Sequence, residues 1–310
     1  MVSQVSWYFI PISIIISFII LGIVLCIIVK RYLNKWKNEL SLNMKSLCKI
    51  YNIPPITLEG FFPDKFDKQL ALSLLMLNYS VTSWSGCQTN LPKLDNFIIK
   101  KTFQGYDSKA NKNRDVATLY YSQNLNMAIM SFSGTMYISE WDNDFDFTQV
   151  NPKDINRDNN ILVHEHDYEM YNSLRNGFII ALNDIISSIS PDEKSDFLFI
   201  ATGHSLGGAL SSLCFFDIVS NNIIKENEGE GYKVLYTFGS PRVGNSAFAD
   251  IINKQPTAFR VANSEDIITT LPLPIVGNTI YEHTDTCISF SMNLNNYTSN
   301  HIDSYIKALS

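Results

Sequence analysis

Residues 1–29 form the longest apolar stretch of the chain and contain no aspartate, glutamate, lysine, arginine or histidine. The part from Trp7 to Val29 is interrupted only by Pro11 and a few small residues. A helix rises about 1.5 Å per residue, so this part reaches roughly 30–35 Å, which is enough to cross a bilayer. No basic segment precedes it and no small-residue cleavage site follows it, which argues against a cleaved signal peptide. We therefore expect residues 1–29 to be a retained, single-pass membrane anchor.

Basic residues follow this stretch and none precedes it. By the positive-inside rule, this asymmetry places the rest of the chain on the cytoplasmic side of the membrane. Residues 30–57 then combine lysines with apolar residues at helical spacing, namely Trp36, Leu40, Met44, Leu47 and Tyr51. This pattern predicts a basic amphipathic helix that either lies near the membrane or packs on the globular domain. Pro54 and Pro55 end it, so we expect the globular domain to span residues 58–310.

From residue 58 onward, apolar runs of strand length alternate with stretches of helical periodicity. The helical stretches are 64–81, 168–189, 209–220 and 302–309. The strand-like runs are 116–122, 127–132, 197–201, 233–238, 258–261 and 287–292. The short separation of the first two runs predicts a hairpin. The interleaving of helices and strands predicts an α/β fold with a mostly parallel central sheet, covered by helices on both faces.

One of these strands runs into the sequence Gly203-His204-Ser205-Leu206-Gly207, and a helical stretch follows at once. A G-x-S-x-G sequence between a strand and a helix is typical of a nucleophile elbow, in which a sharp turn raises the serine hydroxyl above the sheet edge. The small residues let the two backbones approach each other. The pattern predicts a catalytic Ser205, with the backbone N–H of Leu206 directed toward an oxyanion formed there.

A serine nucleophile needs a base and an acid that orients the base. In this fold the chain order is serine, acid, histidine, which leaves His283 and His301 as possible bases. His301 follows the last predicted strand, whereas His283 precedes it, so the order favours His301. For the acid, Asp266 and its neighbour Glu265 both follow the strand at 258–261, and the residues alone leave both open.

Charge and cysteine content narrow the possible partners. The net charge of −6 and the scattered lysines and arginines argue against a nucleic-acid partner. The five cysteines show no paired spacing, which predicts free thiols and no zinc site. We expect neither a metal nor an organic cofactor.

Several ordered blocks of the chain, from about Leu70 to the C-terminus, resemble the class 3 lipases, the fungal-type triacylglycerol lipase family of α/β-hydrolases. The blocks are 132–135 (FSGT), 140–147 (EWDNDFDF), 203–210 (GHSLGGAL), 236–245 (YTFGSPRVGN), 263–272 and Asn300-His301 before Tyr305. There are also departures. Ser133 stands where many members have arginine, and His166 and Asp167 replace the glycine and phenylalanine of a Val-His-x-Gly-Phe block.

The resemblance implies roles for particular residues. It makes Thr135 the second oxyanion donor beside Leu206, and it assigns a lid to the segment with Trp141 and Asp144. It selects Asp266 over Glu265 as the acid, and His301 as the base.

Together these observations predict a membrane-anchored serine hydrolase that cleaves the carboxylic esters of lipids, such as triacylglycerol or other acylglycerols. Two kinds of alternative stay open. The same elbow also serves general carboxylesterases, phospholipases and acyltransferases. A catalytically silent, membrane-tethered scaffold is an alternative of a different class.

Overall fold

The computed structural model describes residues 31, 51–134, 147–224, 231–284 and 287–310. The predicted anchor, residues 1–29, lies outside these ranges, as does nearly all of the predicted amphipathic segment 30–57. Within the described ranges, no helix combines the length and the apolar character that a membrane span requires. The anchor therefore stays a prediction.

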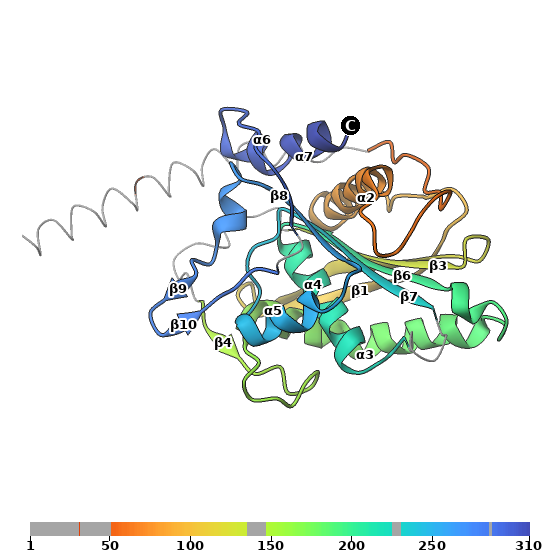
Figure 1. The fold of residues 1–310 in the computed structure, drawn as a ribbon, viewed down its shortest axis with the longest axis horizontal. Helices are drawn as coiled ribbons and strands as arrows, with labels where there is room; N and C mark the ends of the chain where they lie inside the picture. Colours follow the sequence, from red (N-terminus) through yellow and green to blue (C-terminus); the bar gives the residue numbers. More distant parts are fainter. Residues whose placement is uncertain (1–30, 32–50, 135–146, 225–230, 285–286) are drawn as a thin grey trace, which may run out of the picture.

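A seven-stranded sheet forms the centre of the fold (Figure 1). Its strand order is β1-β2-β3-β6-β7-β8-β11. The first three strands pair in antiparallel fashion, and every later pair, from β3 with β6 to β8 with β11, is parallel. The strands span Ile98–Asp107 (β1), Lys112–Ser122 (β2), Met127–Phe132 (β3), Leu198–His204 (β6), Tyr232–Phe238 (β7), Ala258–Asn263 (β8) and Cys287–Phe290 (β11). The mostly parallel α/β sheet predicted from the sequence is confirmed.

Helices cover both faces of the sheet, as Figure 1 shows. On one face lie α2 (Lys68–Cys87) and α7 (Asp303–Leu309), which also contact each other. On the other face lie α3 (Glu165–Ser188) and α4 (Leu206–Ser220), with α5 (Ser246–Asn253) packed against α4. Each face buries its own apolar cluster. The remaining short elements are β4 (Gln149–Val150), β5 (Val163–His164), β9 (Ile275–Val276), β10 (Thr279–Ile280), α6 (Tyr297–His301) and two 3₁₀ turns, Lys194–Asp196 and Ile267–Thr270.

The structure also contains elements that the hydrophobic pattern did not predict. The edge strand β1 is largely exposed, and its first five residues all face solvent, so it has no apolar run to mark it. The predicted final helix, 302–309, corresponds to α7, and a separate short helix, α6, precedes it across a turn at Ile302. His301 therefore ends α6 and does not open the last helix.

Packing on the sheet begins before the predicted boundary at residue 58. The Tyr51 ring lies 5.6 Å from the ring of Tyr79 on α2. Ile53 and Ile56 pack against the same apolar cluster. Residues 51–57 are therefore part of the globular unit.

The prediction that all cysteines are free is wrong at one position. Cys214 and Cys287 are free, but Cys87 at the end of α2 is disulfide-bonded. Spacing along the chain could not reveal this bond, because no paired cysteine motif includes Cys87.

A buried ion pair joins the two helices on the face of α3. Asp217 of α4 is fully buried, and both of its carboxylate oxygens accept hydrogen bonds from the Arg175 guanidinium of α3, at 2.7 and 2.9 Å. The Tyr171 hydroxyl donates a third bond, at 2.7 Å. Because α4 begins directly after Ser205, this pair helps to fix the helix on which the elbow depends.

We predict that Arg175→Ala lowers the free energy of unfolding by about 3–5 kcal/mol, because it leaves a buried carboxylate without its charged partner. Chemical denaturation monitored by circular dichroism measures the change. Arg157→Ala, which removes an exposed arginine, is the matched control and should change stability by less than about 0.5 kcal/mol. Equal effects of the two substitutions would contradict the prediction.

Candidate active site

Ser205 occupies a strained turn between β6 and α4. Its backbone has φ 59° and ψ −127°, a conformation that is unusual for any residue but glycine. The two flanking glycines allow the strand and the helix to meet. A Cβ added at Gly203 would lie 2.0 Å from the carbonyl oxygen of Gly207, and one at Gly207 would lie 2.5 Å from that of Phe132. Side chains at these positions would force the turn open.

A backbone hydrogen bond fixes the turn to the next strand, and the serine side chain does not cap the helix. The Ser205 N–H donates to the carbonyl of Phe238 at the end of β7, at 3.0 Å. Ser205 is the N-cap of α4, but its hydroxyl does not cap the helix. The N–H of Leu206 is the first of the helix and has no intrahelical partner. The helix N-terminus therefore presents a positive potential beside the serine.

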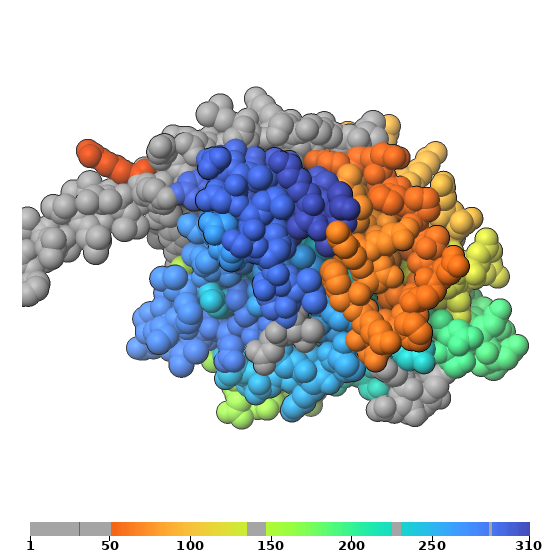
Figure 2. All heavy atoms as spheres, turned by 45° about the horizontal axis from the view of Figure 1, so that its top comes forward, coloured from red at the N-terminus to blue at the C-terminus, as the bar shows by residue number. Residues whose placement is uncertain are grey.

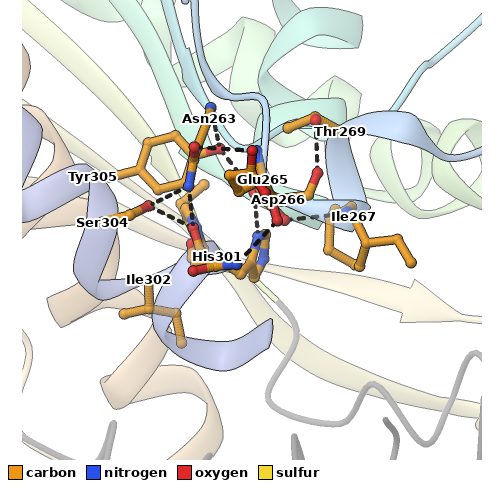
Figure 3. Close-up of polar contacts among 12 residues, drawn as sticks. Asn263, Glu265, Asp266, Ile267, Thr269, His301, Ile302, Ser304 and Tyr305 are labelled. Atoms are coloured by element: carbon orange, nitrogen blue, oxygen red, sulfur yellow. Dashed lines mark hydrogen bonds and ion pairs between the residues drawn. The ribbon is translucent and has the colours of Figure 1, made fainter. Parts of the chain in front are cut away.

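Asp266 and His301 form a buried pair close to this turn (Figure 3). His301 Nδ1 lies 2.7 Å from Asp266 Oδ2. The same oxygen accepts a hydrogen bond from the Tyr305 hydroxyl at 2.8 Å, and the other oxygen accepts one from the Ile268 N–H at 3.0 Å. Burial raises the pKa of Tyr305 well above its usual range, so this hydroxyl stays protonated and can donate.

This arrangement sets the position of the imidazole proton. A carboxylate that accepts two further hydrogen bonds favours a proton on Nδ1, which leaves the lone pair on Nε2. His301 Nε2 is buried and has no hydrogen-bond partner within the described ranges. A buried imidazole nitrogen without a hydrogen-bond partner is energetically costly, which marks Nε2 as a candidate for a functional contact.

Contacts with His204 and Gly239 place His301 beside the elbow. The rings of His204 and His301 lie 4.4 Å apart, and His204 Nε2 donates to the backbone carbonyl of His301 at 2.7 Å. Burial lowers the pKa of His204 well below its usual range, and His301 lowers it further. His204 is thus a neutral support and not a second base. A Cβ added at Gly239 would lie 3.2 Å from His301 Cε1 and 3.0 Å from Asp266 Oδ2.

Asn263, at the end of β8, links the loops that carry the acid and the base (Figure 3). Its side-chain amide donates to the backbone carbonyls of Met292 and Asn300, at 2.9 and 3.2 Å. Its side-chain oxygen accepts from the N–H groups of Met292 and Glu265, at 3.0 and 3.2 Å. A single fully buried side chain therefore holds three segments around the pair.

Part of the expected oxyanion region can be described. The N–H of Gly134 donates to Thr82 Oγ1 of α2 at 2.8 Å, and a Cβ added at Gly134 would lie 3.7 Å from Ser205 Cβ. The chain therefore passes next to the serine just before Thr135. Thr135 and the predicted lid residues Trp141 and Asp144 lie outside the described ranges.

The two alternatives from the sequence lie elsewhere. Glu265 is exposed, and its carboxylate contacts Ser291 and Asn293. The His283 ring nitrogen Nε2 lies 2.6 Å from the carbonyl of Thr269. The structure brings Asp266 together with His301 and leaves Glu265 and His283 outside the pair.

Sequence reasoning missed three residues that build this site. Tyr305 donates to the acid, Asn263 joins the loops and Thr82 holds Gly134. Asn263 and Tyr305 stand within the blocks that resemble class 3 lipases, but the residue types alone do not indicate which atoms they contact. Thr82 is an ordinary helix residue in sequence, with no signal of its own.

Comparisons with known proteins show similarity to lipases and phospholipases. Residues 129–276 match the family described as lipase (class 3). Phospholipase A1-II 5 of Oryza sativa subsp. indica is 34% identical over 108 residues, which cover 34% of this chain and 23% of that protein. The secreted mono- and diacylglycerol lipase A of Penicillium cyclopium is 27% identical over 175 residues, which cover 56% of this chain and 52% of that protein. The chain thus spans only about a quarter to a half of these curated relatives.

Solved structures show the same fold. A triacylglycerol lipase with a serine protease triad at its catalytic centre superposes with a TM-score of 0.55 and 22% identity, covering 76% of this chain and 86% of that one. The mono- and diacylglycerol lipase of Aspergillus oryzae gives a TM-score of 0.55 and 20% identity, covering 71% and 78%. The α/β-hydrolase fold predicted from the sequence is confirmed.

Acid should weaken the fold through His283. Burial, together with the nearby charge of Arg260, lowers its pKa from 6.5 to about 3. Between these two values the unfolded chain takes up a proton that the folded chain does not, so the free energy of unfolding falls as the pH falls. The contribution is at most about 1.4 kcal/mol per pH unit.

We predict that His283→Gln, which keeps a donor for the Thr269 carbonyl, reduces the loss of thermal stability between about pH 6.5 and 4.5. Differential scanning fluorimetry should show the drop in Tm shrink by about 2–4 °C relative to the unmodified chain. Parallel curves for the two proteins would show that His283 titrates normally.

Proposed function

We propose that the chain is a class 3 lipase, a serine hydrolase that cleaves the carboxylic esters of lipids, because residues 129–276 match that family and the curated relatives include lipases. One observation carries the proposal. In the buried 2.7 Å contact between Asp266 and His301, Nε2 of His301 has no partner among the described residues, and the His301 ring contacts that of His204, the residue before Ser205.

In the proposed first half-reaction, Ser205 Oγ attacks the ester carbonyl carbon while His301 Nε2 takes the hydroxyl proton. A C–O bond forms, and the carbonyl electron pair moves to the oxygen. Asp266 stabilises the imidazolium that results, because it lies fully buried against Nδ1. His301 then returns the proton to the alkoxy oxygen as the ester C–O bond breaks, and the alcohol leaves.

The second half-reaction repeats these steps with water as the nucleophile. His301 takes a proton from water, the hydroxyl adds to the acyl carbon, and the Ser205 oxygen leaves with the returned proton. The Leu206 N–H and, from the family resemblance, the N–H of Thr135 stabilise the oxyanion in both halves. Each such donor is worth about 10²–10³ in rate. The steps require no metal or organic cofactor, which remains a prediction.

Acylglycerols are the substrates that the comparisons support best. The relatives are named for hydrolysis of mono- and diacylglycerols and for phospholipase A1 activity, and both activities cleave a glycerol ester. We therefore propose a lipid with an acylated glycerol as the substrate class. Phospholipid is the second candidate, supported by the phospholipase relatives alone.

We also propose that residues 1–29 anchor the enzyme in a membrane. Support comes from the uncharged apolar stretch in the sequence. The basic residues after it favour a cytoplasmic hydrolase domain. The disulfide at Cys87 is the opposing observation, since such bonds are typical of oxidising compartments.

We predict that Ser205→Ala lowers the rate of p-nitrophenyl butyrate hydrolysis by at least about 10⁴-fold and leaves the melting temperature unchanged within about 2 °C. The alanine removes the nucleophile but no packed atoms beyond the hydroxyl. Spectrophotometric assays of the purified full-length chain measure the rate. Ser211→Ala, a buried serine of the same helix, is the matched control and should keep its activity. Equal rates in the parent and the Ser205 variant would reject the serine mechanism and favour the scaffold alternative.

We predict that the full-length chain resists extraction from membranes by alkaline carbonate, and that Ile15→Asp with Ile20→Asp releases it. Two aspartates in the centre of a span cost about 3 kcal/mol each. The fraction in the membrane pellet is measured by immunoblotting. An extractable parent chain would exclude the anchor. Protease protection of the same vesicles reports the side on which the hydrolase domain lies.

A further inference from the structure

The hairpin of β9 and β10, together with Leu273 just before it, exposes an unusual amount of apolar surface. We call residues 273–280 the apolar hairpin. Leu273 is 56% exposed, Ile275 is 69% exposed and Ile280 is 58% exposed. Figure 1 shows the hairpin projecting from the body of the molecule, and in Figure 2 blue atoms of this part of the chain lie on the left side of the coloured body.

The exposed side chains share one face of the hairpin. Ile275 and Ile280 are directly opposite each other in the antiparallel register, and so are Val276 and Thr279. Because side chains alternate along a strand, the two pairs point to opposite faces. Val276 and Thr279 are the partly buried pair. The isoleucine pair therefore faces outward.

The hairpin also lacks charge. The chain has no aspartate, glutamate, lysine, arginine or histidine between Asp266 and Glu282, although the whole chain carries a net charge of −6. An uncharged, aliphatic, protruding surface avoids the desolvation of charges when it enters an apolar medium.

Hydrogen bonds fix the hairpin relative to the active site. Arg242 Nη1 donates to the carbonyls of Thr270 and Pro272, at 2.6 and 2.7 Å, in the segment that begins with Asp266. On the other side, Gln149 Nε2 donates to the carbonyl of Ile280 at 2.9 Å. The hairpin is thus held at a set position beside the acid loop.

We propose that the apolar hairpin docks on the surface of a lipid bilayer and so brings the active site to ester substrates within it. The proposal rests on the proposed function, because the acid loop that leads into the hairpin is part of the catalytic machinery. Entry of three aliphatic side chains into the headgroup and acyl boundary matches the depth of about 5–10 Å that interfacial elements reach.

A protein partner fits this surface less well. Protein interfaces depend on aromatic and arginine anchors within a polar rim, and the exposed face of the hairpin has only aliphatic side chains. Strands of two residues also offer too little backbone to pair with a second copy of the chain.

The test compares two double variants of the full-length chain. Ile275→Asp with Ile280→Asp alters the hairpin. Ile98→Asp with Ile180→Asp is the matched control, because these isoleucines are 60% and 61% exposed and lie on β1 and α3, at the opposite edge of the sheet. Hydrolysis of dioleoylglycerol in phosphatidylcholine vesicles should fall about tenfold in the hairpin variant and less than about twofold in the control. Hydrolysis of soluble p-nitrophenyl butyrate should stay within about twofold in both, which also reports correct folding.

A second measurement does not need catalysis. Ile280→Trp and Ile180→Trp each add one exposed indole, and vesicles of brominated phosphatidylcholine quench indoles that enter the acyl region. The added fluorescence of Trp at position 280 should be quenched, and that at position 180 should not.

Each outcome decides the proposal. Quenching at 280 alone, with a selective loss on vesicles, supports it. Equal vesicle rates in the hairpin and control variants, or equal quenching at both positions, would overturn it. A hairpin variant that changes the oligomeric state in light scattering, with its vesicle rate intact, would assign the surface to self-association instead. Absence of any ester hydrolysis in the parent chain would reject the proposed function, whereas the quenching experiment would still decide the docking surface.

Discussion

The close approach of β6 and α4 is the constraint on which the rest of the site depends. The two backbones meet where Gly203 and Gly207 leave no room for a Cβ, and the residue between the strand and the helix must take a positive φ. That single turn sets the direction of the Ser205 side chain, leaves the first N–H of α4 without an intrahelical partner and lets the serine N–H bond to the end of β7. Strain of about 1–3 kcal/mol at one residue is stable here because buried packing on both sides overdetermines it.

The acid–base pair is stabilised in a different way, by hydrogen bonds donated to a buried carboxylate. Asp266 has almost no exposed surface, so an ionised carboxylate there needs every hydrogen bond that it receives. The donors come from the imidazole, from Tyr305 on α7 and from the Ile268 N–H. His204, only 4.4 Å from the base, adds no competing charge because burial lowers its pKa well below the usual range. The site thus places one carboxylate beside two imidazole rings that make separate contacts.

The sequence predicted those parts of the fold that a local pattern specifies. Buried parallel strands are continuous apolar runs, and the elbow is a compact motif, so β6, β7, β8 and α4 could be found from residues alone. The strand β1 could not, because most of its side chains face solvent. The role of Asn263 depends on contacts with residues up to 41 positions away in sequence, and no spacing rule encodes such contacts. The disulfide at Cys87 was not predicted because no paired cysteine spacing marks it in the sequence.

The topology explains why a docking surface and a catalytic site can share one edge of the molecule. Parallel strands send their carboxyl ends to the same side of the sheet, where Ser205 follows β6 and Asp266 follows β8. Because β8 and β11 are parallel, the connection after β8 starts at that edge and must cross to the opposite end of the sheet to begin β11, and the apolar hairpin lies within this connection. Lengthening such a loop costs little conformational free energy, so a lipid-facing element can be added there without disturbing the sheet. The hairpin therefore lies beside the acid because of the order of the strands. Its aliphatic side chains do not follow from that order, and we attribute them to the proposed docking function.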